Sequence, residues 1–238
     1  MIYHIEQTTS TNDDAQQQDY HHGDVIWAEY QTKGRGQRGH KWSSVEGKNL
    51  TFSLILEPTF LPVAEQFLLS EIVALALVES LAAYGIGCRI KWTNDIYFED
   101  RKLVGILIEH HYSSGALART IVGIGINVNQ TVFDPELPNP VSMQQITRRA
   151  YDREEVLHTF LEKMAARYTQ LKRGEKLAIE DDYQRLMYRL ESLHTFRLPS
   201  GEEFEATIEG VRSTGELKLR HQDGSHHEYL FREVEFVL

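Results

Sequence analysis

Hydrophobic and polar positions follow two periods along the first 190 residues. Short alternating or wholly apolar runs predict strands, and these runs span residues 1–7, 25–30, 50–56, 88–92, 96–98, 103–109 and 120–126. Apolar residues at helical spacing predict a short helix from about residue 13, a long helix ending near residue 84, and helices over 153–172 and 177–190. We therefore expect an α+β domain, with helices packed on one face of a mixed or antiparallel sheet.

The pattern changes near residue 191. Short apolar segments over residues 196–198, 204–211, 216–221 and 228–231 follow one another with glycine turns between them. Such turns connect neighbouring antiparallel strands. We therefore predict a main domain over residues 1–190 and a small β-barrel over residues 191–238, which carries no obvious catalytic groups of its own.

Composition indicates a globular protein of a reducing compartment. The 238 residues are 41% hydrophobic and 25% charged. Cys88 is the single cysteine, so an internal disulfide is excluded. The most apolar run, residues 67–83, contains Glu71 and Glu79 and suits a buried helix better than a membrane span. We expect a cytoplasmic protein without a membrane partner.

The charge balance argues against DNA as the main partner. Sequence-independent affinity for DNA comes from neutralised phosphates, and this chain has 35 acidic against 25 basic residues. No basic helix with a helix-turn-helix pattern precedes the first predicted strand. We expect no DNA partner.

One loop departs from this acidic balance. Between residues 33 and 48, Glu46 stands alone against five basic residues: Lys33, Arg35, Arg38, Lys41 and Lys48. The spacing Gly34-x-Gly36-x-x-Gly39 matches a dinucleotide fingerprint, but a strand pattern follows it instead of the required helix. The better interpretation is a loop between two strands that binds an anion through backbone N–H and guanidinium groups.

Charged residues and glycines in the next strands indicate a site beside that loop. Asp95 follows a strand end and Lys102 follows a tight turn, so we expect them to lie close together, as part of a site or as a solvated ion pair. Gly105, Gly123 and Gly125 weaken their strands. They mark bulges or packing positions, or a ligand that lies across the sheet.

Two other features allow more than one interpretation. Trp42, within the cationic loop, packs either in the core or against a ligand. Adjacent histidines at residues 21–22, 110–111 and 226–227 suggest a metal site. Neighbours along a strand point to opposite faces, however, so we expect no zinc ligation by these pairs.

Taken in order, these stretches resemble the biotin–protein ligases, in the short form that lacks the DNA-binding repressor domain. The resemblance covers nearly the whole chain and rests on Ser10-Thr11-Asn12, Gln31, Gly34-Arg35-Gly36-Gln37-Arg38-Gly39, Lys91-Trp92-Thr93-Asn94-Asp95, Lys102-Leu103-Val104-Gly105-Ile106-Leu107 and Gly125-Ile126-Asn127. Each motif is weak alone, and the ordered set is specific. It implies a biotin/lipoate ligase fold like that of class II aminoacyl-tRNA synthetases, followed by a small SH3-like β-barrel.

The resemblance also implies a role for each matching residue. The residues that would bind biotin are Ser10, Thr11, Asn12, Gln31, Gly34, Arg35, Gly36, Gln37, Lys102 and Gly105. Those that would bind the adenylate are Arg38, Trp42, Asn49 and Asn127. Catalysis would fall to Lys102, Arg35 and Asp95, and Asp95 is also the candidate ligand of Mg²⁺.

By the same resemblance, ATP and Mg²⁺ would activate biotin as biotinyl-5′-AMP, without a tightly bound prosthetic group. The acceptor would be a lysine of a biotin carboxyl carrier domain. A lipoate or octanoate ligase is the alternative enzyme, a non-catalytic biotin- or adenylate-binding sensor is the alternative of another class, and a DNA-binding repressor is the third. A weak homodimer through the strand near residues 109–112 stays open.

Two positions depart from the family. Thr93 stands where proline is usual, which removes a backbone restraint but no reacting group. Gln37 stands where many members have an arginine that helps to retain the reactive adenylate.

We predict that Gln37→Arg slows the escape of biotinyl adenylate, because the added charge attracts the phosphate. The measurement is the rate at which preloaded adenylate leaves the protein. Equal release rates for the two proteins would contradict this prediction.

Overall fold

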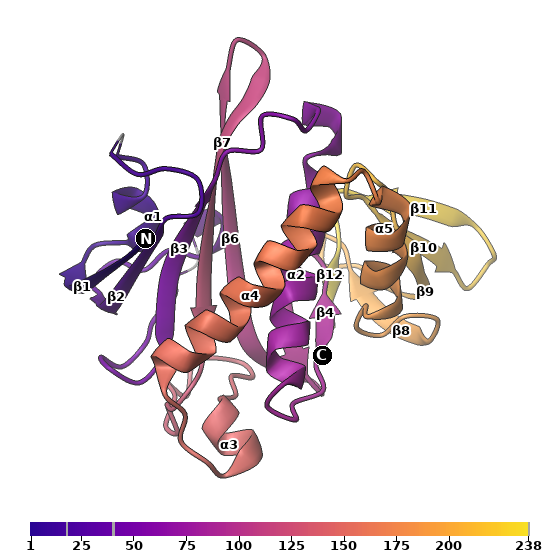
Figure 1. The fold of residues 1–238 in the computed structure, drawn as a ribbon. Coiled ribbons are helices and arrows are strands. Elements are labelled where there is room, and N and C mark those ends of the chain that lie inside the picture. The colour runs from indigo at the N-terminus through magenta and orange to yellow at the C-terminus, as the bar shows by residue number, and fades with distance from the viewer. Residues whose placement is uncertain (18, 40, 238) are drawn as a thin grey trace.

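The main sheet has mixed pairing. In this computed structural model, residues 1–17, 19–39 and 41–237 are described, apart from the side chain of Arg38. Within these residues a seven-stranded sheet has the order β1-β2-β3-β7-β6-β5-β4 (Figure 1). The strands are β1 Ile2–Thr8, β2 Val25–Gln31, β3 Leu50–Leu56, β4 Arg89–Lys91, β5 Asp95–Phe98, β6 Arg101–Ser113 and β7 Ala116–Ile126. Strands β1 and β2 are parallel, and the other pairs are antiparallel. The predicted α+β class with a mixed sheet is confirmed.

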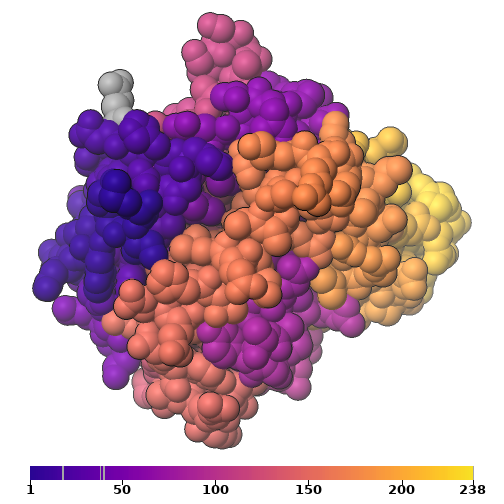
Figure 2. All heavy atoms as spheres, in the orientation of Figure 1, coloured from indigo at the N-terminus to yellow at the C-terminus, as the bar shows by residue number. Residues whose placement is uncertain are grey.

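The longer helices α2 Phe67–Ala82, α4 Arg153–Lys172 and α5 Lys176–Arg185 lie on one face of this sheet. The short helices are α1 Thr11–Asp14, on the other face, and α3 Met143–Thr147, and the short 3₁₀ turns are η1 Gln37–Gly39 and η2 Val63–Glu65. Helix α2 crosses the sheet and is in turn covered by α4 and α5 (Figure 1), so it is apolar on nearly every side. The orange surface of α4 and α5 dominates this side of the molecule in Figure 2. None of the helices in the described ranges is long and apolar enough to cross a membrane.

The two faces of strand β7 differ in side-chain size. Val122, Ile124 and Ile126 belong to the hydrophobic core shared with α2. Side chains alternate along a strand, so Gly123 and Gly125 face the other way. Helix α1 lies on this second face, where Ala15 packs with Ile26, Ile55 and Ile121. The second face therefore carries a shallow glycine strip beside a small apolar patch.

The C-terminal segment forms a sheet that is not closed into the predicted barrel. Its described strands are β8 Leu193–Arg197, β9 Glu203–Val211, β10 Leu217–His221, β11 His226–Tyr229 and β12 Glu235–Phe236, in the order β11-β10-β9-β8-β12. Strands β11 and β12 lie at opposite edges, and the two residues of β12 pair with β8. Closure would require the edge strands to pair with each other, so the barrel prediction was wrong in this respect.

Periodicity located most other elements. The predicted strand 50–56 and helix 153–172 match β3 and α4. The hairpin of β6 and β7 is longer than predicted and projects above the sheet (Figure 1). The pattern missed α3, whose Ser142 and Gln145 form a capping box, and also the short strand β12.

A buried carboxyl group on α2 makes stability depend on pH. Glu71 is 3% exposed, and its Oε2 has no hydrogen-bond partner among the described residues. Burial, with a smaller contribution from Glu180, raises the pKa of Glu71 from 4.5 to about 8. The folded protein therefore holds a proton here that the unfolded chain releases above about pH 4.5.

We predict that Glu71→Gln removes this pH dependence. The free energy of unfolding of the parent should fall relative to the variant as pH rises from about 4.5 to about 8 and then level off, by a difference on the order of 3 to 5 kcal/mol. Urea unfolding at several pH values measures this difference, with Glu162→Gln, 74% exposed on α4, as the control. A difference that does not change with pH would contradict the assignment.

Candidate active site

A cavity of about 930 Å³ lies over the glycine-bearing face of the main sheet. Its walls come from α1, the loop after β2, strands β4 to β7, residues 133–140 and the C-terminal residues 231–236. Most predicted site residues line it: Ser10, Thr11, Asn12, Gln31, Arg35, Gly36, Gln37, Trp42, Asp95, Lys102, Gly105 and Asn127. The structure thus brings together residues that are more than 100 positions apart in sequence.

Side chains of the protein itself occupy the glycine strip. A Cβ atom at Gly125 would lie 2.2 Å from Trp42 Cε2, and one at Gly105 would lie 2.8 Å from Trp42 Cζ3. A Cβ atom at Gly123 would lie 2.2 Å from Asn12 Oδ1. The close approach predicted for these glycines is therefore made by Trp42 and Asn12, and the indole forms part of the cavity floor.

The cationic loop closes on itself above this floor. Trp42 N donates a hydrogen bond to Gly34 O at 3.0 Å, and Arg35 forms an antiparallel bridge with Lys41. A Cβ atom at Gly34 would lie 2.3 Å from Trp42 O, so only glycine fits there. Gly34 is not among the lining residues and shapes the loop instead.

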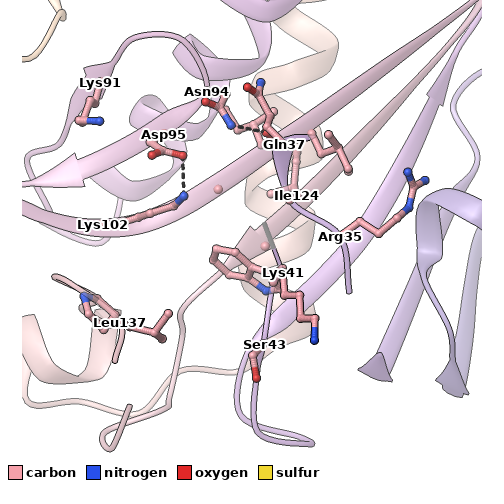
Figure 3. A pocket seen from close by; sticks show the side chains of 18 of the residues that line it. Arg35, Gln37, Lys41, Ser43, Lys91, Asn94, Asp95, Lys102, Ile124 and Leu137 are labelled. Atoms are coloured by element: carbon pink, nitrogen blue, oxygen red, sulfur yellow. Dashed lines mark hydrogen bonds and ion pairs between the residues drawn. The ribbon is translucent and has the colours of Figure 1, made fainter. Parts of the chain in front are cut away.

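Carboxylates neutralise Arg35. Its guanidinium donates hydrogen bonds of 2.9 and 2.8 Å to the two oxygens of Glu109, and it lies 2.8 Å from Asp13 Oδ1. These hydrogen bonds to Glu109 raise the pKa of Arg35. In Figure 3, Arg35 points away from Lys102 and Asp95. The sequence prediction missed Glu109, although strand periodicity from Gly105 would have placed it on the same face.

A buried polar cluster forms the α1 end of the cavity. Thr11 donates from N and Oγ1 to Gln31 Oε1, at 2.8 and 3.2 Å. Ser53 Oγ lies 2.8 Å from Thr11 Oγ1 and 2.6 Å from Asn12 Oδ1. Asn12 Nδ2 donates to Glu109 Oε2 at 2.7 Å, which connects this cluster to Arg35.

These bonds also set the charge of Glu109. Its burial would raise the pKa of the carboxyl group, but the hydrogen bonds from Arg35 and Asn12 outweigh burial and hold that pKa below its usual value. Glu109 is therefore an anion at neutral pH and links the cationic loop to the cluster on α1.

Lys102 and Asp95 form an ion pair in the part of the cavity that lies over β5 and β6, away from α1. Lys102 Nζ lies 2.7 Å from Asp95 Oδ1 (Figure 3), and Lys102 is 33% exposed. The predicted proximity of the two is confirmed. Lys91, which the sequence analysis gave no role, lies beside them, and burial lowers the pKa of its ammonium group.

Of the residues predicted to bind the adenylate, some line the cavity and another supports the cavity wall from behind. Asn127 lines the cavity, whereas Asn49 is 2% exposed behind it. Asn49 donates to Gln130 Oε1 at 2.7 Å and accepts from Val128 N at 3.0 Å, so it braces the strand end next to Asn127. The prediction for Arg38 concerns a side chain outside the described part of the structure.

The described residues of the cavity do not form a metal-binding cluster of their own. Among the described residues, no group of three or more His, Cys, Asp or Glu is arranged to hold a metal ion. Asp95 would therefore offer Mg²⁺ a single carboxylate, which suits an ion that arrives with its phosphate ligands.

Two walls of the cavity were missed by the sequence analysis. Residues 133–140 were expected to be an irregular connection, and residues 231–236 to lack site groups. Both reach the cavity through tertiary packing, so local periodicity carries no signal for them.

Comparison with known proteins agrees with this geometry. Residues 2–127, more than half of the chain, match the Biotin/lipoate A/B protein ligase family. The biotin–[acetyl-CoA-carboxylase] ligase of Paracoccus denitrificans is 32% identical over 202 residues, which are 82% of this chain and 83% of that protein. The biotin protein ligase of Aquifex aeolicus in complex with biotin and ATP superimposes with a TM-score of 0.84 at 27% identity, over 99% of both chains.

Other relatives are longer than this chain. The bifunctional ligase/repressor BirA of Bacillus subtilis is 35% identical over 174 residues, which cover 71% of this chain and 53% of that protein. The chain thus spans about half the length of these bifunctional relatives. With its fold, its cavity and these matches, the chain belongs to the Biotin/lipoate A/B protein ligase family.

We predict that Gly125→Ala frees the cationic loop, because the added methyl group displaces the Trp42 indole from the sheet. Trypsin should then cleave the loop at its lysines and arginines at least about 10-fold faster. Gly87→Ala is the matched control, since a Cβ atom there meets nothing within 4 Å. Equal cleavage rates for the two variants would contradict the packing of Trp42 described above.

Proposed function

We propose that the chain activates biotin with ATP as biotinyl-5′-AMP and transfers it to a lysine of a biotin carboxyl carrier domain. The products are a biotinyl amide, AMP and pyrophosphate. The observation that supports this most is one cavity that runs from the buried polar cluster on α1 to the ion pair of Lys102 and Asp95. Such a cavity suits a ligand with a polar ring at one end and a reacting carboxylate at the other.

The polar cluster suits the ureido ring of biotin, which has one carbonyl acceptor and two N–H donors. Ser10, Thr11 and Asn12 are 2 to 3% exposed, and Gln31 lies against Thr11. Hydroxyl and amide groups both donate and accept hydrogen bonds, so they can complement both kinds of ureido group. Their mutual hydrogen bonds fix their orientation before a ligand binds, which lowers the cost of binding.

Lys102 would promote the first chemical step. A carboxylate is a poor acyl donor, and its attack on the α-phosphate brings one anion against another. An ammonium group between them stabilises the charge of the transition state. Asp95 holds Lys102 at 2.7 Å and so fixes its position. Mg²⁺ carried by ATP would add further charge neutralisation beside Asp95.

The cationic loop would then protect the product. The mixed anhydride hydrolyses in water, so it must stay enclosed until an acceptor lysine arrives. Gly36 and Gln37 line the cavity next to Arg35, which is anchored by Glu109. A loop anchored by an ion pair at one point can open for the carrier and close again.

Three further expectations belong to this proposal. The first is a ligase domain over residues 1–190, followed by a second unit over 191–238 whose residues 231–236 add a wall to the cavity. The second is a cytoplasmic location, where carrier domains are made. The third is that biotin, rather than lipoate, is the acid. The matched family includes both kinds of ligase, and the motif Ser10-Thr11-Asn12 favours biotin.

We predict that the protein, given ATP and Mg²⁺, adds one biotinyl group to a biotin carboxyl carrier domain, as measured by intact mass. Lys102→Ala should reduce the initial rate by at least about 100-fold, because it removes the charge beside the reacting carboxylate. Lys163→Ala on α4, far from the cavity, is the matched control and should retain activity.

Parallel reactions with lipoate and octanoate separate the alternatives, since each acyl group has its own mass. A gain of lipoyl or octanoyl mass would reassign the substrate. Biotin binding without any acyl gain would favour a sensor over an enzyme.

A further inference from the structure

Lys91 is a cation of the cavity that forms no ion pair with any described residue. It lies on β4, lines the cavity and is partly buried. Its Nζ lies 5.3 Å from the ring centroid of Tyr97 and 4.7 Å from that of Phe236. Within the described residues, no hydrogen bond or ion pair to this Nζ is found, whereas the neighbouring Lys102 has Asp95 at 2.7 Å.

Such an arrangement is costly for the unliganded protein. Burial lowers the pKa of Lys91, the charge of Asp95 across the strand pair opposes this in part, and Lys102 and Arg189 lower the pKa further. Aromatic faces stabilise an ammonium group by only about 0.5 to 2 kcal/mol. Lys91 is a half-buried cation beside a charged site, and its ammonium group forms no ion pair with any described residue. Such a cation indicates an anionic ligand.

The strand order fixes where along the cavity this anion would lie. The polar cluster belongs to α1 and β2, on one side of the sheet, and Lys91 belongs to β4, the edge strand on the other side. Lys91 pairs with Asp95 across β4 and β5. The ion pair of Asp95 and Lys102 therefore lies between the polar cluster and Lys91.

The geometry of phosphoryl transfer matches this order. When the biotin carboxylate attacks the α-phosphorus, a C(O)O–P bond forms and the bond from the α-phosphorus to the bridging oxygen breaks. The electron pair leaves with pyrophosphate, and no proton needs to move. The attacking and leaving oxygens lie roughly in line, so pyrophosphate departs on the side away from biotin. With biotin at α1 and the reacting carboxylate near Lys102, that side is β4.

We propose that Lys91 binds the β- and γ-phosphates of ATP and the departing pyrophosphate, and that Tyr97 and Phe236 hold its ammonium group in place. This inference rests on the proposed function for the direction of the reaction. Phe236 lies on β12 of the C-terminal sheet. The C-terminal sheet thereby supplies a positioning residue for the nucleotide end of the cavity.

Binding of Mg²⁺-pyrophosphate, measured by calorimetry, tests this without requiring turnover. Lys91→Met should weaken binding by about 10- to 100-fold, the loss expected for one charge-assisted contact. Lys91→Arg should restore most of it, and Phe236→Leu should weaken it by about 3-fold. Biotin binding without nucleotide should stay unchanged in all three. Lys163→Met on α4 is the matched control.

Equal pyrophosphate affinities for Lys91→Met and the parent would overturn the inference, as would equal losses of biotin binding and pyrophosphate binding in that variant. If Lys91→Met does not fold, the pH profile decides. As pH rises above neutrality, pyrophosphate binding to the parent should fall more steeply than binding to Lys91→Arg, because burial lowers the pKa of Lys91 and arginine stays charged. Parallel profiles would contradict the role of Lys91. The proposed function has its own test: it fails if the parent protein makes no biotinyl adenylate, whatever the pyrophosphate affinities are.

Discussion

The site depends on the contrast between the two faces of β6 and β7. One face is filled by branched apolar side chains that pack against α2, and the other is reduced to glycine at Gly105, Gly123 and Gly125. This contrast lets the Trp42 indole and the Asn12 amide lie directly on the backbone. With larger side chains at these glycines, the Trp42 indole could not lie on the sheet, and the cationic loop could not pack over the cavity as it does.

Charge in the cavity is distributed unevenly, which sequence counting did not show. The loop from residue 33 to 48 is rich in basic residues, yet Arg35 is matched by Glu109 and Asp13. Lys102 is matched by Asp95. Such pairing holds the loop and orients the reacting ammonium group. Lys91 has no such ion pair among the described residues and is partly buried, so we assign it to an anionic ligand.

Local patterns predicted the elements better than their distant contacts. The period of two found β3, the period of 3.6 found α4, and a tight turn brought Asp95 close to Lys102. By contrast, Phe236 and residues 133–140 reach the cavity only through the tertiary fold. The barrel prediction was wrong for a similar reason, because closure depends on how the edge strands meet and not on the pattern within each strand.

A crystal structure of the protein with biotinyl-5′-AMP would show whether one cavity binds both halves of this ligand. We expect the ureido ring at Ser10, Thr11 and Gln31, and the phosphate beside Lys102. A ligand that binds in the opposite direction, or outside the cavity over the glycine strip, would contradict this binding mode.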